Sequence, residues 1–255
     1  MRTRRDDHVR WLRVEGARMA DAAEAAGLDA KVPTCPDWRV RDLLRHTGGV
    51  HRFAAAIVGG RLTKRPRGEE HAAIVRDWPE DDDGLLPWFR DGHARLVDVL
   101  GAADLDTECW SFQPAPSPVE FWARRQAHET TIHRIDAEAA GRGATPVSAG
   151  FAADGVDEIL RHFFTSRNPQ VTAEPPRTLA VRAVDTGDAW LVTIGPDGVD
   201  TARGYGMADC TVTGNAGDLY TLLWNRRGAT GLTVTGDASV LELWRTRAHV
   251  IWPWD

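Results

Sequence analysis

The segment HETTIHRIDAE (residues 128–138) decides the fold of the first half of the chain, because its residues repeat with a helical period. At about 100° per residue, Glu129 and His133 are one turn apart and share a face of the helix. His128 lies about 140° around the helix from His133. An apolar stripe flanks the shared face: Phe121, Ile132, Ile135 and Ala139. The pattern predicts a bundle helix over residues 118–140 that carries potential ligands.

The segment differs by one residue from the HExxH motif of zinc proteases. In that motif two histidines four residues apart bind the metal, and the glutamate acts as a base. Here the two histidines are five residues apart, so they cannot readily share one ion. The pair with chelating spacing is Glu129 with His133, and a glutamate–histidine pair is a known metal unit of helical bundles. An exposed side-chain pair is the alternative at this spacing.

A second predicted helix, residues 36–60, offers a third ligand. Its apolar stripe follows a 3-4-3-4 step through Leu43, His46, Val50, Phe53 and Ile57. A histidine on an apolar face is more often a core residue, but His46 can meet Glu129 and His133 from a neighbouring helix. Two histidines and one carboxylate leave an open position on zinc, as catalytic sites do. We predict this three-residue set, without His128 and without His51, which we expect to face solvent.

The remaining segments indicate two domains. Predicted helices over residues 7–26, 36–60, 84–102 and 118–140 favour a four-helix bundle. The charged stretch between the second and third helices, residues 61–83, contains Pro66 and Pro79 and is predicted to be a loop. We favour a solvent-exposed loop over the alternative, a loop that covers the mouth of the bundle. The composition changes in GRGATPVSAG, so we place the boundary between residues 1–145 and 146–255.

The second domain reads as a smaller α+β unit. Residues 178–184 and 189–195 are strand-like on either side of the turn DTGD and predict a hairpin. Further strands and helices are predicted at these positions: helix 150–164, strand 208–214, helix 218–227, strand 231–237 and helix 239–247. The last six residues, VIWPWD, are expected to pack as a tail across the domain interface.

Composition excludes several classes of function. The net charge is -6 and the pI is about 5.8, which argues against non-specific binding of nucleic acid. Three scattered cysteines form no CxxC pair and indicate a reducing compartment. No apolar run approaches the length of a membrane span. We expect a cytoplasmic protein, a monomer or weak dimer, whose partners are small molecules rather than nucleic acid or membrane.

Two runs, VPTCPDWRVRDLLRHTGGVHRF (residues 32–53) and RRQAHETTIHRIDAEAAG (residues 124–141), resemble the mycothiol-dependent maleylpyruvate isomerase family of DinB-like metal-binding bundles. The family pattern is a tryptophan and DLL..H, then HE...HR.DAE. It matches at Trp38, Asp42, Leu43, Leu44, His46, His128, Glu129, His133, Arg134, Asp136 and Glu138. The resemblance implies that His46, Glu129 and His133 hold a divalent metal, usually zinc. Three roles stay open for Asp136: it orients a ligand histidine, it pairs with Arg134, or it faces solvent.

The second half resembles the same family's sterol-carrier-like C-terminal domain. Its motifs match at Gly214, Asp218, Leu219, Leu223, Trp224, Arg226, Leu232, Val234, Gly236, Asp237, Leu241 and Trp244. The resemblance implies that an arginine of this domain reaches the active site and holds a substrate carboxylate. Arg226 is the best match and Arg227 the alternative, although an arginine at the end of a helix also fits the helix dipole.

The resemblance also implies mycothiol as thiol cofactor or co-substrate. In both reactions that we expect, a metal-activated thiolate adds to an electrophilic carbon. The enzyme is an isomerase when the thiolate is released again, and an S-transferase when the thiolate stays attached. Two alternatives remain open on the sequence: a metal-dependent hydrolase that uses zinc-bound water, and a non-catalytic metal-binding or ligand-binding module.

Overall fold

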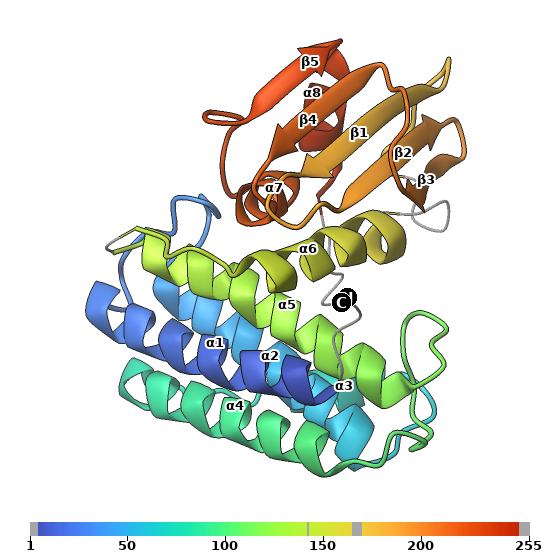
Figure 1. The fold of residues 1–255 in the computed structure, drawn as a ribbon. Coiled ribbons are helices and arrows are strands. Elements are labelled where there is room, and N and C mark those ends of the chain that lie inside the picture. Colours follow the sequence, from blue (N-terminus) through green and yellow to red (C-terminus); the bar gives the residue numbers. More distant parts are fainter. Residues whose placement is uncertain (1–4, 142, 165–169, 250–255) are drawn as a thin grey trace. The chain divides into compact units, whose positions relative to one another are not determined.

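A computed structural model describes residues 5–141, 143–164 and 170–249 of the chain (Figure 1). Of these described residues, those up to Thr145 form one compact unit, and those from Pro146 onward form the other. Each unit buries apolar side chains of its own, such as Leu43 in the first and Leu179 in the second. The last six residues, for which the sequence predicts a packed tail, lie outside the described residues.

The first unit is the four-helix bundle that the sequence predicts, which is confirmed (Figure 1). Its long helices are α1 (Arg5–Ala26), α2 (Val40–Gly59), α4 (Leu85–Ala102) and α5 (Pro118–Ala139). The loop prediction for residues 61–83 is wrong in part, because this stretch contains the short helix α3 (Gly68–Val75) and a 3-10 turn, η1 (Asp82–Gly84). α3 buries His71 and Val75. Eight residues are too few to show an amphipathic repeat against their charged neighbours.

Helix α2 begins at Val40, later than the sequence predicts. The preceding residues 31–39 form a loop whose first and last residues pair in an isolated β-bridge. Inside it, the Val32 amide donates to the Trp38 carbonyl over 3.0 Å. The Asp42 carboxylate accepts a hydrogen bond from the backbone N–H of the last loop residue at 2.9 Å, which fixes the entry into the helix. The loop is therefore held at both ends beside the bundle.

Helix α5 is buried on nearly every side. Between residues 122 and 137 every residue except Arg124 is buried, and within the bundle this helix packs mainly against α1 and α2. Buried charges must be paired to offset the loss of hydration. Arg134, fully buried, donates from Nε to Glu15 of α1 and from Nη1 to Glu138, each over 2.7 Å. This network ties α5 to α1.

Two consecutive glycines, Gly48 and Gly49, let neighbouring elements approach the backbone of α2. A Cβ at Gly48 would lie 2.2 Å from the Trp88 ring of α4. A Cβ at Gly49 would lie 2.6 Å from the Val75 carbonyl oxygen of α3. Because this second neighbour is backbone, no side-chain rotation relieves the contact.

The second unit has the predicted α+β class, which is confirmed. It begins with α6 (Ala149–Glu158), which continues as a π-helical turn (Ile159–Phe163). A five-stranded sheet follows, in the order β3-β2-β1-β4-β5, with helix α7 between its last two strands in the sequence and helix α8 after them. The bounds are β1 (Arg177–Ala183), β2 (Ala189–Gly195), β3 (Gly198–Arg203), β4 (Cys210–Gly214), α7 (Ala216–Leu223), β5 (Thr233–Gly236) and α8 (Ala238–Arg247). Strand β1 runs antiparallel to β2 and parallel to β4.

The sheet departs from the sequence prediction in two places. The sequence does not predict strand β3, because this edge strand buries only its first two residues and lacks apolar alternation. Helix α7 ends at Leu223 rather than at residue 227, and Asn225 then adopts a left-handed conformation with φ of 58°. Asparagine tolerates that region better than most residues do, so it stops the helix.

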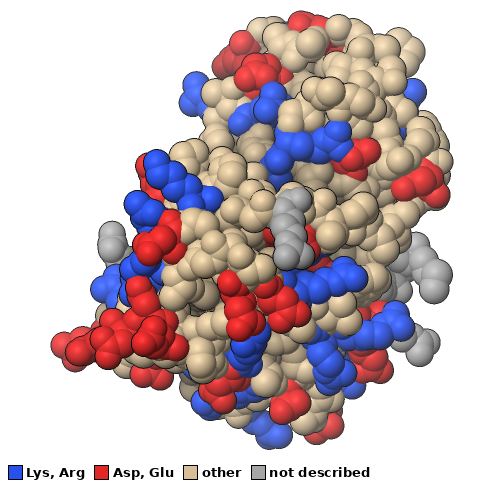
Figure 2. All heavy atoms as spheres, turned by 90° about the vertical axis from the view of Figure 1, so that its left-hand side faces the viewer, with Lys and Arg blue, Asp and Glu red and all other residues tan. Residues whose placement is uncertain are grey.

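The surface carries both signs of charge. On the face drawn in Figure 2, lysine and arginine side chains alternate with aspartate and glutamate and form no broad basic area, in keeping with the net charge of -6. Among the described residues, none of the helices combines the length and the apolar character needed to cross a bilayer.

We expect Gly49→Ala to lower the free energy of unfolding by about 1–3 kcal/mol, because the Val75 carbonyl must move. Chemical denaturation followed by circular dichroism measures this change. Gly101→Ala is the matched control in α4, since its new Cβ would lie 3.9 Å from Val9, an ordinary contact. There we expect no loss, and a gain of up to ~1 kcal/mol from helix propensity. Equal stability of the two variants would contradict the packing argument.

Candidate metal centre

The predicted ligand residues come together between helices α2 and α5. His46 is on α2, and Glu129 and His133 are one turn apart on α5. Both histidines direct Nε2 at the same carboxylate oxygen: Oε1 of Glu129 lies 3.2 Å from His46 Nε2 and 3.3 Å from His133 Nε2. The ligating atoms of the three residues all lie within 4.8 Å of one another. The three side chains therefore converge on one point.

The spacing of these atoms fits a small divalent ion. Tetrahedral zinc with ligands at about 2.0–2.1 Å has neighbouring ligand atoms roughly 3.3–3.4 Å apart. The two nitrogen–oxygen distances, 3.2 Å and 3.3 Å, match that separation. Imidazole nitrogen and carboxylate oxygen are also ligands that zinc accepts, and three protein ligands leave a fourth position open. The residues fit a metal ion, and its presence stays a prediction.

Trp38 forms an aromatic wall beside the two histidines. Its ring centroid lies 4.9 Å from that of His46 and 6.1 Å from that of His133, with an angle of 27° to the second ring. The side chains of His46, Glu129 and His133 are only 7%, 6% and 9% exposed. Partial exclusion of water lowers the local dielectric and strengthens the electrostatic interactions of the centre.

Asp136 orients one of the histidines. It is fully buried, and its Oδ2 accepts a hydrogen bond from His133 Nδ1 over 2.9 Å. Thr34 donates to Oδ1 over 2.6 Å, and the Cys35 thiol donates to Oδ2 over 3.7 Å. Because the carboxylate holds the Nδ1 proton, Nε2 is the atom of His133 that would give up its proton and offer a lone pair to a metal at the centre. Of the three roles that the sequence left open for Asp136, the structure selects this one.

Arg125 binds the other oxygen of the ligand carboxylate. Its Nη2 donates to Oε2 of Glu129 over 2.9 Å, and its side chain is only 2% exposed. The sequence analysis missed this residue. The clue in the sequence is the position of Arg125 four residues before Glu129, because this spacing places both side chains on one face of α5.

Burial and these hydrogen bonds set the charges of the centre. Burial alone would raise the pKa of Glu129, but hydrogen bonds from His133 and His46, with the positive charge of Arg125, hold it well below its usual range. Burial lowers the pKa of His46. Burial acts in the same direction on His133, yet its hydrogen bonds to Asp136 and Glu129 outweigh it and raise the pKa. A metal ion binds such a centre in competition with the proton on His133.

Both halves of the chain match family models. Residues 9–138 match the mycothiol maleylpyruvate isomerase N-terminal domain, and residues 150–243 match the C-terminal domain of the same family. The chain belongs to the mycothiol maleylpyruvate isomerase family. The family resemblance predicted from the sequence is thereby confirmed. No match was found among the curated proteins.

Solved structures agree with this family at the level of the fold. The chain is similar to the crystal structure of a mycothiol-dependent maleylpyruvate isomerase, with a TM-score of 0.61 and 15% identity over 91% of this chain and 93% of that one. It is equally similar to a histidine-to-alanine mutant of a mycothiol-dependent maleylpyruvate isomerase, with a TM-score of 0.61, 14% identity and the same coverage. At these identities the likeness shows a shared fold.

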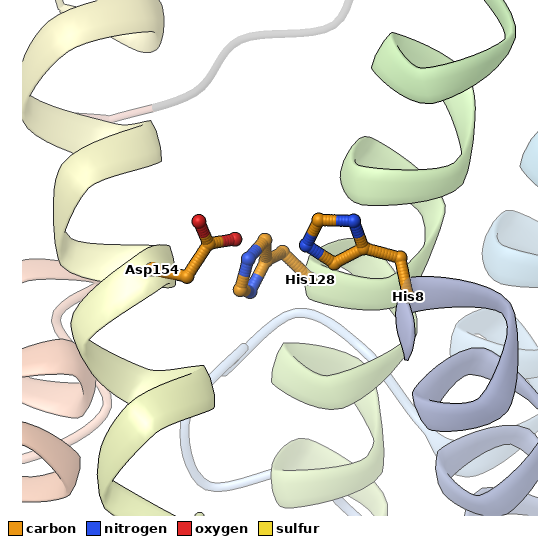
Figure 3. Close-up of side chains that lie close together, drawn as sticks. All are labelled: His8, His128 and Asp154. Carbon is orange, nitrogen blue, oxygen red and sulfur yellow. The ribbon is translucent and has the colours of Figure 1, made fainter. Parts of the chain in front are cut away.

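Two other histidines of the family motifs lie outside the predicted ligand set. His128 lies beside His8 of α1, as Figure 3 shows, with their ring centroids 6.1 Å apart. Asp154, also labelled there, belongs to the C-terminal unit. The prediction that His51 faces solvent is wrong, because it is fully buried and its Nε2 lies 2.8 Å from Thr130 Oγ1. Helix α4 covers this side of α2, which the sequence of α2 alone does not reveal.

Arg226, the predicted catalytic arginine, lies in the C-terminal unit just after α7. Its Nη1 donates to the Trp224 carbonyl over 2.8 Å, a bond typical of an arginine at the end of a helix. The alternative, Arg227, forms an ion pair with Asp218. The catalytic role of Arg226 in this family member stays a prediction.

We expect Asp136→Asn to weaken binding of a divalent metal by about 10–100-fold. The reason is that a neutral amide holds the Nδ1 proton of His133 less strongly than a carboxylate does, and so fixes the tautomer less well. Competition with a chromophoric chelator measures the dissociation constant. Glu120→Gln removes an exposed carboxylate from the same helix and should leave that constant unchanged. An unchanged constant in Asp136→Asn would show that the aspartate does not support a ligand.

The buried His51 should make stability depend on pH. Burial and the nearby His93 lower its pKa well below 6.5, so the folded protein keeps it neutral while the unfolded chain binds a proton near pH 6.5. Its stabilising contribution is therefore complete above about pH 6.5 and is lost as the pH falls, by up to about 1.4 kcal/mol per pH unit.

The variant His51→Gln should flatten the dependence of unfolding free energy on pH below about 6.5. Denaturant unfolding across a pH series measures it. His249→Gln replaces an exposed histidine and should keep the wild-type slope. Identical slopes in wild type and His51→Gln would assign the pH dependence to other groups.

Proposed function

We propose that the chain is a metal-dependent enzyme that uses mycothiol and adds its sulfur to an electrophilic carbon of a small molecule. The observation that carries this proposal is the convergence of His46, Glu129 and His133 in a member of the mycothiol maleylpyruvate isomerase family. Zinc or another divalent metal is the ion we expect there. A divalent ion with an open position lowers the pKa of a thiol and so supplies a sulfur nucleophile at neutral pH.

The protein's own side chains prepare the centre for this chemistry. Asp136 keeps a proton on His133 Nδ1, so that Nε2 offers its lone pair. Arg125 holds one oxygen of Glu129 and leaves the other facing the two histidines. Trp38 limits access of water, which protects a thiolate from solvation.

The reaction begins with attack of the thiolate on a carbon–carbon double bond conjugated to a carbonyl. A sulfur–carbon bond forms, and the π electrons move to the carbonyl oxygen as an enolate. The former double bond is now single and can rotate. When the enolate re-forms the double bond and expels the thiolate, the product is the geometric isomer and the thiol is regenerated. When the enolate carbon takes a proton instead, the sulfur stays attached and the product is a thioether.

A substrate with carboxylates needs a cationic partner, and Arg226 is our assignment. A guanidinium matches a carboxylate with two parallel hydrogen bonds. We place the reaction in the cytoplasm, because Cys35, Cys109 and Cys210 are all free thiols, as a reducing compartment requires.

The test combines metal analysis with turnover. We expect about one divalent ion per wild-type chain, loss of most of it in His46→Ala, and retention in the matched variant His128→Ala. Circular dichroism of each variant checks folding. No metal in the wild type, or full retention in His46→Ala, would overturn the assignment of the ligands.

Turnover then separates the reactions. Maleylpyruvate and other conjugated electrophiles are offered with and without mycothiol, and mass spectrometry detects the products. An isomer without an adduct indicates an isomerase, and a mycothiol thioether indicates an S-transferase. Turnover that is indifferent to mycothiol would point to a metal hydrolase instead. Bound metal without any turnover would point to a non-catalytic binding module.

A further inference from the structure

The two oxygens of the Glu129 carboxylate have different partners. Oε1 lies 3.2 Å and 3.3 Å from the Nε2 atoms of His46 and His133. Oε2 accepts a hydrogen bond from Nη2 of Arg125 over 2.9 Å. One oxygen therefore belongs to the converging ligand set, and the other belongs to the arginine.

This division matters because a carboxylate can bind a metal through one oxygen or through both. With one oxygen, Glu129 and the two histidines supply three ligand atoms, and a fourth position stays open. With both oxygens, the carboxylate would take that position itself. A thiol needs the open position, so the number of oxygens that Glu129 contributes decides whether the centre can accept one.

Arg125 is suited to hold an oxygen away from a metal. The arginine and Glu129 side chains are 2% and 6% exposed, so water competes little for their hydrogen bond. The two residues are one turn apart on α5, a rigid helix that is buried along this stretch.

We propose that Arg125 is a positioning residue that restricts Glu129 to one metal-binding oxygen and thereby keeps the fourth position open for a thiol. The inference rests on the proposed metal centre, with Glu129 as a ligand. It assigns a separate task to a residue outside the ligand set: Arg125 controls the coordination number, whereas His46, Glu129 and His133 hold the ion.

Cobalt(II) in place of the native ion reports coordination number directly. Four-coordinate cobalt absorbs visible light several-fold more strongly than five- or six-coordinate cobalt does. We expect strong absorption in the wild type and a fall of at least about twofold in Arg125→Met, because Glu129 then binds through both oxygens. Arg125→Lys keeps a charged donor and should retain most of the absorption. Arg124→Met removes the same charge one residue earlier, about 100° around the helix, and is the matched control.

A thiol probe tests the open position in the same samples. N-acetylcysteine should produce a sulfur-to-cobalt charge-transfer band in the wild type, in Arg125→Lys and in Arg124→Met. In Arg125→Met we expect thiol affinity to fall by about tenfold or more. If Arg125→Met does not fold, Arg125→Leu replaces it, because leucine is neutral and has no hydrogen-bond donor for Oε2.

The outcomes distinguish this inference from the proposed function. A wild-type chain that binds no cobalt would overturn the metal centre itself. Cobalt binding with the same spectrum and thiol affinity in a folded Arg125→Met or Arg125→Leu would overturn the role of Arg125 alone. An equal loss in Arg124→Met would show that general charge, and not the hydrogen bond to Oε2, controls the centre.

Discussion

The bundle depends on the pairing of the charges that α5 buries. This helix packs against α1 and α2, yet it carries arginine, glutamate, aspartate and histidine through its buried stretch. Each such group loses its hydration and must find a partner of opposite charge or a complementary hydrogen-bond partner. Arg134 meets Glu15 of α1, and Asp136 meets Thr34 of the loop before α2. The pairs therefore fix which elements surround α5 and in what register.

In the candidate centre, the paired side chains of this network all point at one shared position. At Arg134 the charges pair with Glu15 and Glu138 and form a structural link between α5 and α1. At Glu129, by contrast, two imidazole nitrogens and one carboxylate oxygen converge, at distances that suit ligands of a tetrahedral ion as well as hydrogen bonds. The surrounding groups, Arg125 and Asp136, hold these atoms in place from outside. The charges that link α5 to α1 and the charges of the candidate centre thus differ in geometry more than in residue type.

The loop of residues 31–39 contacts the candidate centre from outside the four long helices. It supplies a hydrogen bond to Asp136 and the Trp38 ring beside both histidines, although none of its residues is a predicted ligand. A solved member of the mycothiol maleylpyruvate isomerase family shares the fold at only 15% identity. Such a fold tolerates wide sequence change where packing needs only apolar volume. Paired buried charges tolerate far less, because a lost partner leaves a buried charge unsatisfied.

The sequence by itself determined the helical bundle, the α+β character of the second half and the family, because helical and strand periods are local and the motif residues are specific. It also selected His46, Glu129 and His133, since the spacing on each helix limits which side chains can share a face. Only the tertiary structure decided the burial of His51, the bond of Arg125 to Oε2 and the pairing of Asp136 with Thr34. Burial and hydrogen-bond partners depend on which helix or loop covers a face, and that is a property of residues far apart in the chain.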